Sequence, residues 1–64
     1  MKQSEINAMS EDELRERVDS ESANLSKLKF AHAVSPIENP VRIRHARRLV
    51  ARLKTALRAK ELAQ

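Results

Sequence analysis

The second half of the chain carries a dense set of basic residues. The segment 39–60 contains eight of the thirteen Lys and Arg residues of the chain and no Asp or Glu. Six of the eight are arginines: Arg42, Arg44, Arg47, Arg48, Arg52 and Arg58. A planar guanidinium donates two parallel hydrogen bonds to a phosphate, so it suits phosphate binding better than a lysine ammonium does. The chemistry that these residues indicate is the binding of a polyanion.

The overall charge is divided in the same sense. Residues 1–38 hold five basic and eight acidic residues, a net charge of −3, whereas residues 39–64 hold eight basic and one acidic residue, a net charge of +7. The net charge of +4 therefore hides an asymmetry, which predicts that the second half faces the polyanion.

Helical periodicity separates the cations of this segment from an apolar stripe. At about 100° per residue, one arc of a helix over 40–62 holds the apolar residues Ile43, Ala46, Leu49, Val50, Leu53, Ala56 and Leu57. The opposite arc holds the cations Arg44, Arg47, Arg48, Arg52, Lys54 and Arg58, with Ala51 and Ala59 among them. Arg42 and Lys60 fall on the apolar side near the helix ends, where a long side chain can extend to solvent. This helix is predicted to pack with one face and to bind with the other.

Two other interpretations of the cationic arc remain open. The commonest interpretation of a charged helix face is a solvated surface. Such surfaces mix charge signs and often place Glu four residues before Lys or Arg, whereas residues 42–60 contain no Asp or Glu. A membrane-surface helix normally carries Trp or Phe on its apolar face, and Phe30 is the only aromatic residue here. The lack of aromatic residues also removes the stacking platforms of single-strand binders, which favours structured RNA contacted at phosphates and sugars.

Composition argues against catalysis. The chain of 64 residues has no Cys and no Gly, which excludes disulfides, thiolate zinc sites, thiol catalysis and Gly-rich phosphate loops. His32 and His45 are too few and too far apart in sequence for a metal site. No nucleophile stands beside a base, and no apolar run reaches the length of a membrane span or a signal peptide. We therefore predict a soluble cytoplasmic protein that is no enzyme and that holds no cofactor and no metal.

Two long helices must position the cationic arc. Ser10 and Glu13 form the S-x-x-E pattern of a capping box, which predicts a first helix over about 11–34. Its seam is spaced by four and three residues and is interrupted near Glu21 and Ser22. The members of the seam are Leu14, Val18, Leu25, Leu28 and His32.

Two prolines bracket the connection to the second helix. Ser35-Pro36 is expected to end the first helix, because a residue before proline is pushed out of the α region. Asn39 is the predicted N-cap of the second helix, with Pro40 at its first position. The turn then covers 35–39 and the second helix about 40–62, a link short enough for an antiparallel pair.

The predicted fold class is all-α, an antiparallel hairpin of two long helices in a single domain over 1–64. Residues 2–9 can add a short N-terminal helical turn that folds Ile6 and Met9 back onto the hairpin. Phe30 lies nearly opposite the seam of the first helix, so it cannot join the same contact. Either it caps the hairpin end or contacts Ile6 and Met9, or it anchors RNA or a neighbouring protein; the sequence leaves both interpretations open.

The residues also resemble a known family. The stretches MKQSEINAMSEDEL, LSKLKFAHA and IENPVRIRHARRLVARLKTALRAKE are similar to the bacterial ribosomal protein L-twenty-nine family of the large subunit. The resemblance covers nearly the whole chain and is most specific between Asn39 and Thr55. Lys27 and Lys29 stand where the family usually has Asn and Arg, and Ser35 stands where it usually has Gly.

The resemblance implies a helical hairpin bound to ribosomal RNA near the polypeptide exit tunnel. It also implies a neighbouring tunnel-rim protein, the one that docks the trigger factor chaperone and the signal recognition particle. We predict a structural constituent of the large ribosomal subunit, with no membrane or small-molecule partner. The predicted RNA-binding residues are Lys27, Lys29, Asn39, Arg42, Arg44, Arg47, Arg48, Arg52, Lys54 and Arg58.

The alternative from another class is a small coiled-coil adaptor or homodimer. It would use the apolar seam between chains and the basic face for an acidic protein partner. Pro36 and Pro40 on either side of a short turn favour folding back within one chain instead.

Overall fold

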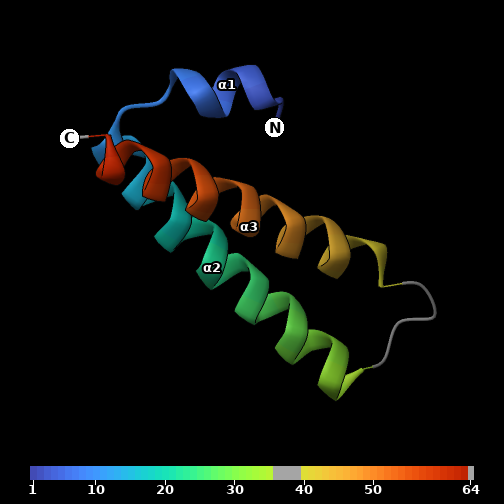
Figure 1. Ribbon diagram of the computed structural model, residues 1–64. Helices are drawn as coiled ribbons and strands as arrows, with labels where there is room; N and C mark the ends of the chain where they lie inside the picture. The colour runs from blue at the N-terminus through green and yellow to red at the C-terminus, as the bar shows by residue number, and fades with distance from the viewer. Residues whose placement is uncertain (36–39, 64) are drawn as a thin grey trace.

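Three helices make up most of the chain. The computed structural model describes residues 1–35 and 40–63. The helices are α1 over Gln3–Ala8, α2 over Glu11–Val34 and α3 over Val41–Leu62. Figure 1 shows α2 and α3 as an antiparallel pair, with α1 beside the half of α3 that is farther from the turn. The predicted all-α hairpin is confirmed, and the short N-terminal turn is a helix of its own.

The first long helix begins where the sequence predicts. Ser10 has an extended backbone, and its Oγ accepts a hydrogen bond from the Glu13 N–H at 3.2 Å. The reciprocal half of the capping box, from the Ser10 N–H to the Glu13 carboxylate, is not formed among the described residues. Acidic residues at 11, 12 and 13 nevertheless place negative charge at the positive end of the helix dipole. The helix ends at Val34, and Ser35 N–H still donates to the Ala31 carbonyl at 2.9 Å.

The second long helix begins one residue later than predicted. Pro40, expected at the first helical position, is the N-cap, because its ψ of 44° is not helical. Its carbonyl accepts the first helical hydrogen bond, from the Arg44 N–H at 3.2 Å, and no side chain of a described residue caps the helix start. Asn39, the predicted N-cap, lies outside the described residues, as does the predicted turn apart from Ser35.

Each helix contributes one residue to the centre of the core. Ile6 of α1, Leu14 of α2 and Leu53 of α3 are completely buried. The partly buried residues packed around them are Met9, Val18, Leu49, Ala56 and Leu57. The expectation that Ile6 and Met9 fold back onto the hairpin is confirmed. Burying one large aliphatic side chain contributes about 1.5–3 kcal/mol, so a core of this size depends on α1 as well as on the hairpin.

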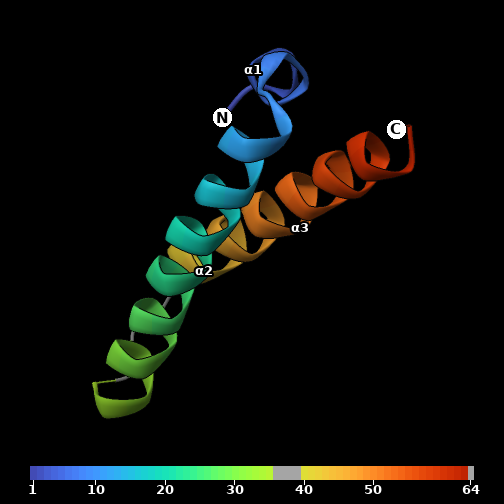
Figure 2. The ribbon, with the colours of Figure 1, turned by 90° about the vertical axis from the view of Figure 1, so that its left-hand side faces the viewer.

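The predicted apolar stripes of the two long helices face each other. On α2, every predicted seam residue is buried or half-buried, and so are Glu21 and Ser22 at its interruption. On α3, all seven residues of the predicted apolar arc are buried or half-buried. Figure 2 shows α2 and α3 crossing at an angle, with α1 over the end far from the turn. The apolar surface that an adaptor would use between chains is thus used within this chain, which measures 43 × 18 × 14 Å.

Candidate nucleic-acid interface

The outward arc of α3 carries exposed cations along most of its length. Its members are exposed without exception: Arg44, Arg47, Arg48, Arg52, Lys54 and Arg58. Ala51 and Ala59, which lie among them, are also exposed. The predicted division of α3 into a packing face and a cationic face is confirmed, since each side of the helix has the burial that its periodicity requires.

The ion pairs of the described residues involve Arg15 and Arg17 of α2. Arg15 of α2 pairs with Glu11, lies 3.6 Å from Asp12 and reaches across to Glu61 of α3 at 3.7 Å between Nη2 and Oε1. Glu61 is the only acidic residue after position 38. Among the described residues, no ion pair joins a carboxylate to a cation of the outward arc of α3. The positive charge of this arc is therefore available to an external partner.

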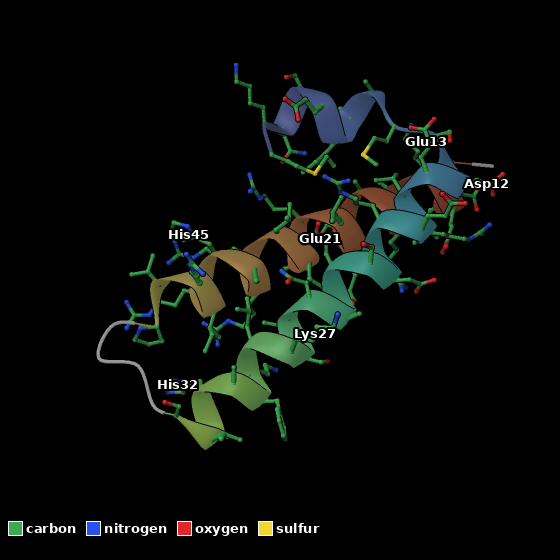
Figure 3. All side chains as sticks on the ribbon, turned by 180° about the vertical axis from the view of Figure 1, so that it is seen from behind. Asp12, Glu13, Glu21, Lys27, His32 and His45 are labelled. Atoms are coloured by element: carbon green, nitrogen blue, oxygen red, sulfur yellow. The ribbon has the colours of Figure 1, made fainter. Side chains whose placement is uncertain are left out.

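A groove runs between α2 and α3 beside this arc. One wall comes from α2, with Glu21, Asn24 and Leu28, and the other comes from α3, with Ala46 and Leu49 at its base. Met1 also lines the groove. Glu21 and His45, both labelled in Figure 3, belong to the two helices that form the walls. The Glu21 carboxylate lies 3.6 Å from the Arg17 Nε on the same helix.

The groove divides the cations of α3 into two groups. The groove cations, Arg42, Arg48 and Arg52, line it. Arg42 was predicted on the apolar side with its side chain extended to solvent, and it is exposed. The outer cations do not line the groove; they are Arg44, Arg47, Lys54 and Arg58.

The remaining predicted binding residues lie apart from these groups. Lys27 and Lys29 are exposed on α2, whereas the seven predicted cations from Arg42 to Arg58 are on α3. Asn39 lies outside the described residues. The seven α3 residues therefore share one helix, and the two lysines lie on the other long helix.

Phe30 is largely exposed to solvent. Its side chain is 72% exposed, and Val34, one turn later, is 70% exposed. Ile6 and Met9 pack at the far end of the hairpin from Phe30. The interpretation of Phe30 as a partner of Ile6 and Met9 is therefore wrong. A cap over the hairpin end would involve residues 36–39, which lie outside the described residues, and the role of Phe30 as an external anchor stays a proposal.

Sequence reasoning missed the polar residues of the groove. Asn24 and His45 are exposed on facing helices and line it together. The available signal was spacing, because Glu21, Asn24 and Leu28 follow one another by three and four residues along the edge of the seam. No group of three or more potential metal ligands occurs in the described residues. Within the same residues, none of the helices is apolar over a length sufficient to cross a bilayer.

Comparison with known proteins decides the family. The family model described as ribosomal L29 protein matches residues 4–60. The chain belongs to this family. It is 55% identical over 60 residues to the large ribosomal subunit protein uL29 of Amoebophilus asiaticus and to that of Cytophaga hutchinsonii, and each match covers 94% of this chain and 97% of the relative. The uL29 protein of Flavobacterium johnsoniae is 53% identical over 62 residues, with 97% and 98% coverage. No solved structure matches the chain.

The family resemblance predicted from the residues is therefore confirmed. The matched segment contains the whole of α2 and almost all of α3, so it includes both walls of the groove and every cation of the outward arc. The relatives carry the name of a ribosomal protein, in agreement with the prediction that the chain is no enzyme.

Proposed function

We propose that the chain is a structural constituent of the large ribosomal subunit that binds ribosomal RNA through the cationic arc of α3. The relatives are named as proteins of that subunit, and family membership supports the same assignment here. The proposed location is the ribosome in the cytoplasm, near the polypeptide exit tunnel and beside a neighbouring tunnel-rim protein. That finer location follows from the family resemblance alone.

The observation that carries RNA binding is an exposed row of cations that has no carboxylate partner within the described residues. From Arg44 to Arg58 the row extends over about 21 Å at 1.5 Å per residue, long enough to reach several phosphates. An exposed arginine contributes little to folding stability, and neighbouring like charges repel one another. A row of exposed arginines is therefore useful mainly in a complex with a polyanion. Because contacts to phosphates position a protein without reading bases, this row suits folded RNA recognised by shape.

Co-sedimentation with large ribosomal subunits tests the proposal. The wild-type chain should remain with the subunits through a high-salt wash, and a variant with Arg44→Ala and Arg47→Ala should be released at lower salt. The matched control is a variant with Arg15→Ala and Arg17→Ala, which removes the same charge from α2, where both arginines pair with carboxylates. Release of the two variants at the same salt concentration would show that total charge, and not the arc, determines binding.

The adaptor alternative makes a different prediction about mass. An adaptor or homodimer needs a second chain on its apolar seam, whereas Leu14 and Leu53 already pack within one chain. Sedimentation equilibrium of the free protein should return a monomer of 7.3 kDa. A stable dimer without RNA would favour the adaptor.

A further inference from the structure

The groove between α2 and α3 has a chemistry different from that of the outer cations. Its base is apolar and is formed by Leu28, Ala46 and Leu49. It is an open surface groove with a volume of about 990 Å³. The row of arginines alone can hold a phosphate backbone. The apolar groove beside that row is therefore suited to a different part of the ligand, one that has an apolar surface.

Polar groups in the groove restrict what that ligand group can be. On the α2 wall, the Asn24 amide forms no hydrogen bond with another described residue. The Glu21 carboxylate beside it only accepts hydrogen bonds, and it repels a phosphate. The three groove cations stand on the opposite helix and outnumber this one carboxylate. The groove therefore has a cationic α3 side for phosphates and an α2 wall that favours a neutral hydrogen-bond donor.

We propose that the groove receives an unpaired nucleotide of the RNA that the outer cations bind, an inference that rests on the proposed function. The flat face of the base would lie on Leu28 and Leu49, and its flanking phosphates would contact Arg48 and Arg52. Splayed nucleotides of loops and bulges are the parts of RNA whose base edges proteins read. Because Glu21 can only accept, the base edge that meets it must present an N–H donor, either an exocyclic amino group or a ring N–H such as that of uracil.

Burial and pairing on α2 support this orientation. The Glu21 carboxylate lies 3.6 Å from the Arg17 Nε and its side chain is 19% exposed, so it lies at the groove wall with an oxygen that can still accept a hydrogen bond. Asn24 is exposed one turn later, so its amide can meet the same base edge without a change in the fold. Neither residue belongs to the buried core.

Site-specific photo-crosslinking tests the inference. Benzoylphenylalanine replaces Asn24 in the full chain, the chain is assembled into large ribosomal subunits, and the crosslinked nucleotide is located by reverse-transcription stops. The matched control places the same group at Ser26, which is also exposed on α2 and does not line the groove. We expect one dominant crosslink from position 24, to a single unpaired nucleotide, and no crosslink to that nucleotide from position 26.

Binding measurements provide the second arm. Asn24→Ala should weaken binding to the RNA fragment that carries this nucleotide by about 2- to 10-fold, the usual range for one lost hydrogen bond, while Ser26→Ala leaves it unchanged. If the protein enters subunits and binds RNA through the outer cations but position 24 crosslinks only to base-paired RNA, to protein or to nothing, the nucleotide inference is overturned and the proposed function stands. If the chain neither enters subunits nor binds RNA, both fail.

Discussion

Arg52 and Leu53 are neighbours in α3, yet Leu53 is completely buried against Ile6 and Leu14 while Arg52 is exposed at the groove. Consecutive residues of a helix point about 100° apart. One step along the chain therefore passes from the residue on which folding depends to a residue proposed to contact RNA. Stability and binding can be separated by changing one or the other.

Leu53→Ala should destabilise the protein by about 2–5 kcal/mol, the usual cost of emptying a fully buried leucine site. Arg52→Ala should leave the melting temperature nearly unchanged and weaken RNA binding directly, because an exposed arginine adds little to stability. Circular dichroism melts and RNA affinity measured on both variants check this. The faces are assigned wrongly if Arg52→Ala unfolds the helices, or if Leu53→Ala loses affinity with full helicity retained.

The short helix α1 is expected to be required for the stability of the hairpin. Ile6→Ala should cost about 2–5 kcal/mol and the milder Ile6→Val about 0.5–1.5 kcal/mol, because Ile6 is completely buried. Each kcal/mol lowers the melting temperature of a domain of this size by about 4–8 °C. Ser4→Ala is the control, since Ser4 is exposed on the same helix. An unchanged melt for both Ile6 variants would mean that α1 does not dock in solution.

The salt dependence of RNA affinity should report the outer cations. Each neutralised phosphate releases counterions, which gives a slope of about −0.7 to −0.9 in a plot of log affinity against log salt. Arg44→Ala and Arg47→Ala should each make the slope shallower by about one unit. Arg15→Ala, which removes a charge that is already paired on α2, should not. Equal slopes for all these proteins would remove the arc from the interface.

Phe30→Ala should leave the stability of the free protein unchanged, because the side chain is 72% exposed. If Phe30 anchors RNA or a neighbouring protein, the same variant should be lost from large subunits at a lower salt concentration than the wild type, since buried aromatic residues dominate interface energies. Ala33→Ser, on the same helix and exposed, is the control. Retention equal to that of the wild type would exclude the anchor role.

The free protein should melt within or below the range of about 45–65 °C that is typical of mesophile domains. A single core rarely supplies more than about 3–5 kcal/mol below 70–80 residues, and the seam of α2 is interrupted at Glu21 and Ser22. Bound RNA should raise the melting temperature by mass action. A cooperative melt of the free protein above about 80 °C would contradict this expectation.

The sequence was sufficient for the helices and their faces because periodicity is a local property. Leu14 and Leu53 are recognisable from spacing alone, and both are completely buried. The groove could not be predicted in the same way, since it depends on the angle at which α2 and α3 cross and on the side where α1 docks (Figure 2). The crossing angle and the docking side are set by packing between distant segments. From the sequence alone, Asn24 was therefore indistinguishable from an ordinary exposed residue at the edge of the seam.

Two smaller differences have the same origin. The start of α3 shifted by one residue because proline fixes φ but not ψ, and Pro40 has a non-helical ψ of 44°. The interpretation of Phe30 as a contact of Ile6 and Met9 failed because α1 packs at the opposite end of the hairpin. Neither the ψ of Pro40 nor the position of α1 is encoded in helical spacing.

The separation of the core residues along the sequence also determines how late during synthesis the protein can fold. Leu14 and Leu53 are 39 positions apart in the sequence, and Ile6 is farther still from its partner on α3. Closing so long a segment must precede any gain from burial, so no N-terminal portion of the nascent chain can form a stable unit by itself. Synthesis that stops before residue 53 yields a chain that lacks the α3 member of the three completely buried residues, so the protein should become stably folded only when α3 has been almost completely made.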